Sequence, residues 1–334
     1  MKSIRRICVF GAGAIGGHLA ARLAAAGLEV SVIARGAQLE AIRSRGLVLR
    51  QQGQPDRGGD VRASDRAADL GPQDAVFVTV KATALPSFAP HAAALTGPDT
   101  VFAFVQNGIP WWYAQGLAPH RPAPPDLSRL DPGGALARAI EPRRVIGGVV
   151  YSSNVVVAPG VIEGYNPGAE HLILGEPGDG EGEALVALRA ALERAGLPSP
   201  ATRDIRAAAW DKLLNNMGAC LCVLLDETLR VFAEDAQMQA LRDAIRREGV
   251  AIAAAHGIDV GAAPRRPGGG QAPPPIEFKP SMLQDLLLGR PMEVEAQLLA
   301  PLAFASAAGV QAPHLRTLAT LVARLASARG LFRP

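Results

Sequence analysis

Gly11-Ala12-Gly13-Ala14-Ile15-Gly16 lies between an apolar run, Arg6 to Phe10, and an Ala- and Leu-rich segment, Ile15 to Ala26. This order is typical of a glycine turn that joins a parallel β-strand to a helix. The first glycine allows the tight turn, the second lets the backbone approach a pyrophosphate, and the third lets the helix pack on the strand. Because a helix N-terminus presents unpaired N–H groups to phosphates, we expect a dinucleotide to bind at Gly11, Gly13, Ala14, Ile15 and Gly16.

The second predicted strand, Glu29 to Ala34, ends at a positive charge, Arg35. An NAD site carries Asp or Glu at this position, and that carboxylate holds the ribose diol. Here the acid is missing, and Arg35 can pair with a 2′-phosphate instead. A solvent-exposed loop arginine is the alternative interpretation. The sequence therefore favours NADPH as the cofactor.

Short apolar runs alternate with helical segments through the first half of the chain. A helix is expected around Gln38 to Arg45, and strands at Ala75 to Val80 and Val101 to Val105. Continuous apolar runs of this kind are typical of strands buried on both faces of a parallel sheet. The alternation indicates an α/β fold with a Rossmann-type, doubly wound sheet. Val145 to Leu174 differs, because its apolar runs and Pro-Gly turn predict hairpin strands.

After Gly182 the pattern is almost purely helical. Helix-spaced Leu, Ala and Val predict helices over 183–195, 206–232, 235–256, 281–288 and 293–308. We therefore expect an N-terminal sheet domain over 1–203 and an all-helical domain over 204–334. Arg121 to Gly134 and Gly261 to Pro275 are rich in Pro and Gly and are expected to be surface loops. The 261–275 loop is either a lid over the motif that follows it or an exposed insertion.

The composition is that of a globular protein and argues against disorder. The chain has 334 residues, 49% hydrophobic and 19% charged, which suits about two domains. A net charge of +3 and only 4% aromatic residues exclude the basic stripe that nucleic acid would need. No apolar run reaches the ~20 residues of a membrane helix, and glycines interrupt the signal-like N-terminus. Three cysteines cannot form a disulfide framework or a four-thiolate zinc site, so we expect no metal and a cytoplasmic location.

Several polar residues are candidates for binding or catalysis. Lys212 and Asn216 lie four apart in a predicted helix and so share one face. An ammonium beside a carboxamide can donate to a carbonyl oxygen that becomes negative as hydride arrives. Lys81 and Asn107 each follow a predicted strand, at the sheet edge where ligands bind in open α/β folds. The alternatives are a surface pair on the helix and loop-capping side chains at the sheet edge.

A further candidate cluster lies in Ser281-Met282-Leu283-Gln284-Asp285 and Gly289-Arg290-Pro291-Met292-Glu293-Val294-Glu295. We expect Pro291 to start a helix and Glu293 to lie in its first turn, where the helix dipole stabilises a carboxylate. Helix-start chemistry alone would explain Glu293, and Glu295 competes with it for a functional role.

These motifs resemble, in order and over nearly the whole chain, those of the ketopantoate reductase (2-dehydropantoate 2-reductase) family. The matching stretches are the glycine turn, Ala-Arg-Gly at 34–36, Val-Lys-Ala at 80–82, Gln-Asn-Gly at 106–108, Trp-x-Lys-Leu-x-x-Asn at 210–216, Ser-Met-x-Gln-Asp at 281–285 and Gly-Arg-x-x-Glu at 289–293. The resemblance implies a Rossmann domain followed by a helical domain of the 6-phosphogluconate dehydrogenase type. It also implies reduction of a 2-oxo acid by NADPH, with 2-dehydropantoate, an intermediate of pantothenate biosynthesis, as the leading substrate.

The resemblance also implies roles for individual residues. Lys212 matches the family's general acid, and Glu293 matches the glutamate that supports the active-site network. Asn107, Asn216 and Ser281 match residues that hold the substrate. Asn107, Lys81 and Arg35 are also expected to contact the cofactor.

The chain departs from the family pattern at several positions near the expected pocket. Cys220-Leu221 replaces Asn-Pro, Met292 replaces Thr, Glu295 replaces Asp, and Leu298-Leu299 replaces Asn-Gly. Most of these changes remove a hydrogen-bonding group, so the identity of the 2-oxo acid is open. Trp111-Trp112-Tyr113 is expected either to line the pocket or to pack between the domains.

Two other functions stay open at this level. One is a related hydroxyacid dehydrogenase acting on another 2-oxo or 3-hydroxy acid. The other is a non-catalytic NADP(H)-binding sensor, against which the retained Lys212, Asn216 and Glu293 argue. The expected partner is a small-molecule 2-oxo acid, and the oligomeric state considered is a homodimer.

Overall fold

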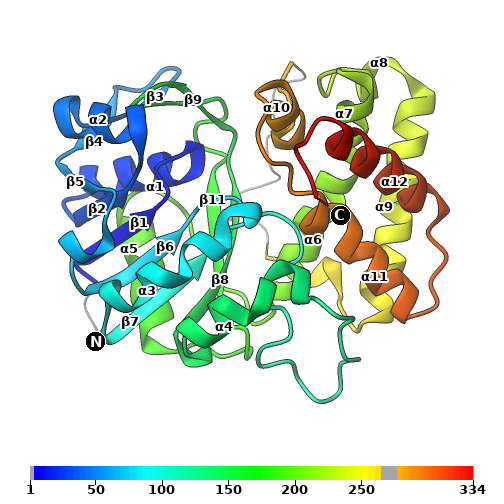
Figure 1. Ribbon diagram of the computed structural model, residues 1–334, viewed down its shortest axis with the longest axis horizontal. Helices are drawn as coiled ribbons and strands as arrows, with labels where there is room; N and C mark the ends of the chain where they lie inside the picture. The colour runs from blue at the N-terminus through cyan, green and yellow to red at the C-terminus, as the bar shows by residue number, and fades with distance from the viewer. Residues whose placement is uncertain (1–3, 265–276, 334) are drawn as a thin grey trace.

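The central sheet is built around β1 (Arg6–Phe10), in a computed structural model that describes residues 4–264 and 277–333. Its seven strands run in the order β11-β8-β7-β6-β1-β2-β5, and every strand is parallel to its neighbours except β11. The other six strands are β2 (Glu29–Ile33), β5 (Val61–Ser64), β6 (Gln73–Val78), β7 (Thr96–Phe104), β8 (Val145–Tyr151) and β11 (His171–Gly175). This arrangement confirms the predicted doubly wound fold (Figure 1).

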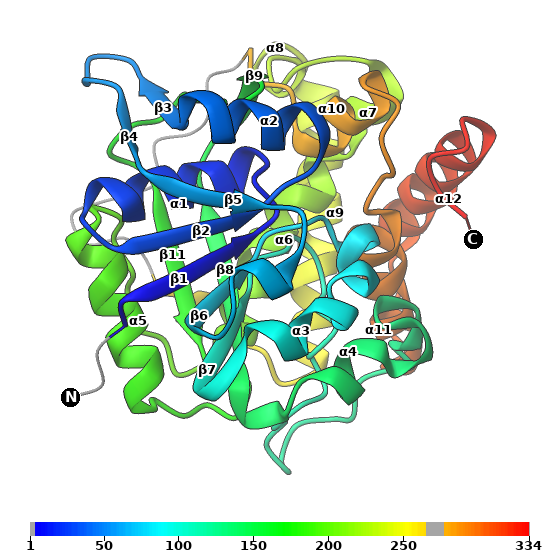
Figure 2. The ribbon, with the colours of Figure 1, turned by 60° about the vertical axis from the view of Figure 1, so that its left-hand side comes forward.

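Both faces of the sheet are covered, as the continuous apolar strands require. Along β1, Cys8 and Phe10 enter one core, whereas Ile7 and Val9 enter the other. The first core includes α3 (Ala89–Leu95), and the second includes α1 (Ala14–Ala25) and α5 (Glu183–Arg194). Figure 2 shows α3 and α4 (Ala135–Ala139) on the side of the sheet opposite α1 and α2 (Gly36–Arg45). Side chains on alternate faces therefore each find a hydrophobic partner.

A second, four-stranded sheet covers α1 and was not predicted as a unit. Its order is β4-β3-β10-β9, with bounds Arg57–Gly59, Leu47–Gln51, Val161–Gly164 and Asn154–Ala158. The predicted hairpin at the Pro-Gly turn is confirmed, because β9 and β10 pair antiparallel. However, β10 also pairs in parallel with β3, more than a hundred residues earlier. Pairing over this distance leaves no local signal in the sequence.

The second half of the chain is helical, as predicted, but two helix boundaries were wrong. The expected 206–232 helix is three helices, α6 (Ile205–Ala219), α7 (Leu221–Leu225) and α8 (Val231–Glu234), and Asp226, with a left-handed φ of 54°, ends α7. Pro291 does not start a helix; the helix begins after Glu293 with a π-helical turn over Glu295–Leu299. The other helices are α9 (Ala236–Ala255), α10 (Ser281–Leu287), α11 (Ala300–Ala307) and α12 (Pro313–Ala328). Residues 265–275 of the predicted 261–275 loop lie outside the described residues.

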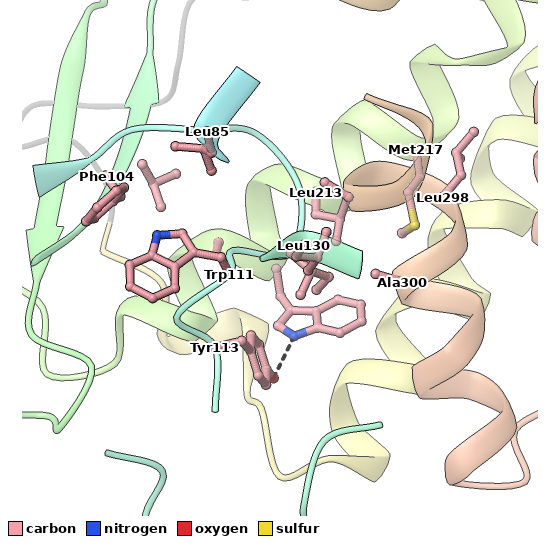
Figure 3. Close-up of a cluster of buried hydrophobic side chains, with 14 of the residues drawn as sticks. Leu85, Phe104, Trp111, Tyr113, Leu130, Leu213, Met217, Leu298 and Ala300 are labelled. Carbon is pink, nitrogen blue, oxygen red and sulfur yellow. Dashed lines mark hydrogen bonds between the residues drawn. The ribbon is translucent and has the colours of Figure 1, made fainter. Parts of the chain in front are cut away.

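The sheet and the helices share one hydrophobic core (Figure 3). Trp111 packs edge-on against Phe104 at the end of β7, with ring centroids 5.0 Å apart. The Trp210 indole on α6 donates a hydrogen bond to the Tyr113 hydroxyl over 3.0 Å. The aromatic cluster therefore packs between the two halves of the molecule, and Trp112 also reaches the pocket described below.

Candidate active site

The glycine turn has the geometry that a dinucleotide phosphate needs. Gly11 has φ +106°, and a Cβ at Gly16 would lie 1.9 Å from the Gly11 carbonyl oxygen, so neither position accepts a side chain. Nothing lies within 4 Å of the Cβ position at Gly13, which caps α1 without a side-chain hydrogen bond. The first turn of α1 therefore faces open space with its N–H groups available to an anion. A coenzyme pyrophosphate fits this cradle.

Arg35 is the residue predicted to pair with a 2′-phosphate of the coenzyme. It is exposed at the N-terminus of α2, directly after β2. Its side chain has no hydrogen-bond or ion-pair partner among the described residues. Gln38, which the sequence analysis did not single out, donates to the Ala12 carbonyl over 2.7 Å and accepts from the Gly160 N–H over 3.0 Å. Gln38 thus ties the glycine turn to α2 and to the β9–β10 hairpin.

Lys81 joins the sheet domain to two buried carboxylates of the helical half. Its ammonium lies 2.5 Å from Asp285 Oδ2 and 3.9 Å from Glu293 Oε2. Glu293 also accepts hydrogen bonds from the Ala82 N–H over 2.8 Å and from Gln297 Nε2 over 3.2 Å. Burial raises the pKa of Asp285, and the Lys81 ammonium opposes that rise. Asp285 belongs to the motif at 281–285, but the amino-acid sequence alone does not predict that it contacts Lys81.

Lys212 lies on α6 and points toward the edge of the sheet. Its ammonium donates to the Val150 carbonyl and lies 5.3 Å from the Tyr151 ring centroid. Burial lowers the pKa of Lys212 to about 8, and the negative charge of Glu293 partly offsets this effect. An ammonium whose pKa lies near neutral pH is suited to donate a proton.

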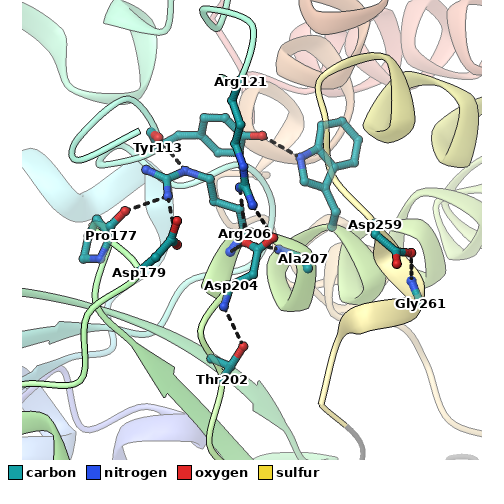
Figure 4. Close-up of polar contacts among 11 residues, drawn as sticks. Tyr113, Arg121, Pro177, Asp179, Thr202, Asp204, Arg206, Ala207, Asp259 and Gly261 are labelled. Atoms are coloured by element: carbon teal, nitrogen blue, oxygen red, sulfur yellow. Dashed lines mark hydrogen bonds and ion pairs between the residues drawn. The ribbon is translucent and has the colours of Figure 1, made fainter. Parts of the chain in front are cut away.

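The start of α6 is fixed by a polar network that sequence reasoning missed (Figure 4). Asp204 caps the helix by accepting from the N–H groups of Arg206 and Ala207 over 3.1 and 3.0 Å. It also pairs with Arg121 at 2.6 Å. Fully buried Arg206 donates to the Tyr113 and Pro177 carbonyls over 2.9 and 2.7 Å. An acid before an apolar helix is an N-cap signal, but its loop partners are distant in sequence.

Asn107 and Lys212 line the same small cavity. Gln106 holds the Asn107 loop, because its side-chain amide donates to the Val78 and Val80 carbonyls over 2.6 and 3.1 Å. Gly108 adopts φ +86°, and a Cβ there would lie 2.5 Å from the Ala296 carbonyl oxygen. The loop after β7 therefore packs directly on the helical half, and this contact brings Asn107 to Lys212.

Asn216, near the C-terminal end of α6, and Ser281, at the start of α10, are linked through residues that neighbour them. Cys220 Sγ is 3.2 Å from the Asn216 carbonyl oxygen and 3.7 Å from the sulfur of Met282, which follows Ser281. Asn107, Asn216 and Ser281 are all half-buried. Their side chains have no hydrogen-bond partner within residues 4–264 and 277–333, so their donors are available to a ligand. Glu295, by contrast, pairs with Arg129 at 2.7 Å.

Two other kinds of feature, a metal centre and a membrane-spanning helix, are absent from the described part of the chain. No cluster of three or more His, Cys, Asp or Glu side chains there is arranged to hold a metal ion. Within the same residues, no helix has both the length and the apolar character needed to cross a bilayer.

Comparison with known proteins places the chain beside one group of reductases. The family model "Ketopantoate reductase PanE/ApbA" matches residues 7–115, and "Ketopantoate reductase PanE/ApbA C terminal" matches residues 204–326. A 2-dehydropantoate 2-reductase from Mesorhizobium japonicum is 39% identical, covering 98% of this chain and 99% of its own. A candidate ketopantoate reductase structure from Ralstonia solanacearum MolK2 has a TM-score of 0.84 at 38% identity and covers 99% of this chain and 100% of that chain.

A more distant structure shares the fold. D-mandelate dehydrogenase, solved with NADH and anilino(oxo)acetate, has a TM-score of 0.77 at 19% identity and covers 98% of this chain and 99% of that chain. Sequence similarity at this level carries the fold and no assignment of substrate.

Proposed function

The chain belongs to the ketopantoate reductase PanE/ApbA family, and on that premise we propose that it reduces 2-dehydropantoate to pantoate with NADPH. Enzymes of this family take hydride from a nicotinamide coenzyme. The observation that carries the proposal is the meeting of Lys212 and Asn107 in one cavity at the carboxyl edge of the sheet. Ligands of open α/β sheets bind at this edge.

When bound, the coenzyme is the source of the hydride that reaches the C2 carbonyl carbon. Lys212 donates a hydrogen bond to the carbonyl oxygen and transfers a proton to it as the alkoxide forms. Asn107 is neutral, so it can orient the oxygen by a hydrogen bond but has no proton to give. Glu293 supports the charged state of Lys212, because its carboxylate raises the lysine pKa against the effect of burial.

Substrate and coenzyme would be held by residues on both sides of the site. The backbone from Gly11 to Gly16 would hold the pyrophosphate, and Arg35 the 2′-phosphate, because no acid stands at the end of β2 to bind a free ribose diol. Asn216 and Ser281 would bind the substrate carboxylate or hydroxyl. Lys81, bound to Asp285 at 2.5 Å, would contact the coenzyme from the neighbouring loop.

The proposal is tested by a coenzyme oxidation assay on the purified protein. NADPH consumption is measured with 2-dehydropantoate, with smaller 2-oxo acids and with bulkier ones, and the reverse reaction with 3-hydroxy acids. We expect the highest kcat/KM with 2-dehydropantoate. A higher value with another acid would revise the substrate, and tight NADPH binding without turnover of any acid would make the protein a sensor.

We also propose a domain boundary, an oligomeric state and a cellular location for this protein. A domain boundary near residue 203 is supported by the start of α6 at Ile205 and by the second family model, which begins at residue 204. A homodimer is supported by exposed Leu287 and Leu288 on α10, and light scattering would test it. A cytoplasmic location is supported by the free, buried state of Cys8, Cys220 and Cys222.

A further inference from the structure

The cavity beside Lys212 has room for about one oxygen atom. Its volume is ≈ 10 Å³, close to the ~10–15 Å³ that a single water molecule requires. The residues that line it include Lys212, Asn107 and Trp112, whose side chains carry an ammonium, a carboxamide and an indole N–H. A buried water needs two to four such partners, so the lining suits one well-held oxygen atom.

Trp112 lines this cavity and packs against β8. Its Cζ2 and Cη2 atoms lie 2.4 and 2.6 Å from where a Cβ would stand on Gly147. Gly148, the next residue of β8, lines the cavity. Trp112 is only 2% exposed, and its N–H has no partner among the residues that the structure describes. A buried N–H without a partner is costly, so an acceptor is expected there.

Trp111 and Trp210 provide internal references for this indole. Trp111 is also buried, and its N–H likewise has no partner within the described chain. It packs on Phe104, however, and is not part of the cavity lining. The Trp210 N–H is hydrogen-bonded to Tyr113 over 3.0 Å. Of the three tryptophans in the sequence, Trp210 is thus the reference for a hydrogen-bonded indole and Trp111 the reference for an unpaired one. The Trp112 indole can be compared with both.

We propose that Trp112 is a positioning residue, whose indole N–H and the Lys212 ammonium donate hydrogen bonds to one oxygen atom in this cavity. The oxygen belongs to an ordered water or to the bound 2-oxo acid, and in either case it holds the ammonium in place. The inference rests on the proposed function for its kinetic consequence, because it assigns Trp112 the task of keeping the proton donor aligned and charged.

The charged and titratable groups that face Lys212 come from three other elements. Glu293 approaches from the segment before α11, and Tyr151 from the end of β8. Tyr151 stacks on His171 of β11 with centroids 4.5 Å apart and donates to Asp211 of α6 over 3.1 Å. Trp112→Phe replaces none of these groups and keeps an aromatic ring at this position, so a shift in the titration of Lys212 would report the cavity oxygen.

A nuclear magnetic resonance experiment tests the hydrogen bond without any assay of activity. The indole nitrogens are labelled with ¹⁵N, and Trp111→Phe and Trp112→Phe assign the signals. We expect the Trp112 indole proton signal to lie downfield, close to that of Trp210. If the oxygen is a water, this shift is seen in the free protein. If the oxygen belongs to the substrate, the shift is seen only after coenzyme and 2-oxo acid are added. A Trp112 signal that stays with that of Trp111 in both states would overturn the proposal.

The pH profiles of the same variants test the positioning role. Without the indole donor, the oxygen no longer holds the Lys212 ammonium. The alkaline limb of the pH–rate profile should therefore move to lower pH, by about half to one pH unit, in Trp112→Phe. A shift in both kcat/KM and kcat identifies a water, because kcat/KM reports the free enzyme. A shift in kcat alone, with a higher KM, identifies a substrate oxygen. Unchanged limbs, or an equal shift in Trp111→Phe, would overturn the proposal.

Failure of the proposed function would look different from failure of this inference. A protein that turns over no 2-oxo acid would refute the reductase activity, yet the indole spectrum of the free protein would still show whether Trp112 holds an oxygen. Melting curves of both variants detect a loss of packing, which lowers the melting temperature without moving the pH profile.

Discussion

At the scale of single residues, the charge on Lys212 makes the site sensitive to pH. Burial lowers its pKa to about 8, and Glu293 acts in the opposite direction. Because the proton donor must be charged, turnover should be constant below pH 8 and should fall as the pH rises through that value. The measurement is kcat at saturating substrate across the alkaline range.

Glu293→Gln is the control for that profile. Removing the carboxylate removes the interaction that raises the lysine pKa, so the alkaline limb should move to lower pH. A kcat that is independent of pH up to ten in the parent protein would contradict this assignment of the proton donor.

Arg35 should set the preference for NADPH over NADH. Hydrogen bonds to charged groups contribute about 1.5–3 kcal/mol, which corresponds to roughly 10–150-fold in kcat/KM. Arg35→Ala should lose most of this preference, whereas Arg45→Ala, at the exposed other end of α2, should retain it. Steady-state kinetics with both coenzymes measures the ratio. Equal use of both coenzymes by the parent protein would rule out this role.

Cys220 should contribute packing and no chemistry. Burial raises the pKa of its thiol to about 12, and its sulfur lies 3.7 Å from that of Met282. A thiol in this state is a poor nucleophile, so Cys220→Ser should keep turnover within a few-fold of the parent. An inactive serine variant, together with stoichiometric inactivation by alkylation of Cys220, would show the opposite.

At the scale of elements, α6 carries the proposed proton donor, Lys212, and is itself fixed at its start by the Asp204 cap. Asp204→Ala removes two hydrogen bonds to the helix N-terminus and the ion pair with Arg121. The loss of a cap costs about 0.5–2 kcal/mol of unfolding free energy, and we expect a value at the upper end together with a lower kcat. Urea denaturation and steady-state kinetics check the two effects.

Asp235→Ala is the matched control for that variant. Asp235 caps α9 through the N–H groups of Gln237 and Met238, over 2.8 and 3.2 Å, but α9 carries none of the predicted site residues. It should lose similar stability and keep its kcat. Equal effects of both variants on kcat would mean that the start of α6 does not position Lys212.

The elements that the sequence predicted best are those with a local signal. The glycine turn, the apolar strands and the Lys212 helix each carry their pattern within one window of the chain. The second sheet does not, since β3 finds β10 only in the folded molecule and β4 is the polar stretch Arg57–Gly59. Likewise, Asp285 could be placed in a motif, but its contact with Lys81 spans 204 residues and could not be inferred.

At the scale of the whole molecule, the candidate site exists only where the two halves meet. The glycine turn, Lys81 and Asn107 belong to the sheet, while Lys212 and Glu293 come from the helical half. The halves are joined by the contact of Lys81 with Asp285 and by the Ile109 N–H, which donates to the Ala296 carbonyl over 2.8 Å. Tertiary contacts therefore bring Lys212 to Asn107 and Glu293 to Lys81.

The central claim is that Lys212 supplies the proton in a reduction by NADPH. Its most direct test is the turnover of Lys212→Ala with 2-dehydropantoate, beside a binding titration with NADPH and the exposed control Lys279→Ala. General acid catalysis contributes ~10²–10⁴-fold, so kcat should fall by about that factor in Lys212→Ala while NADPH binding and the control stay unchanged. A kcat for Lys212→Ala within a few-fold of the parent would contradict the mechanism.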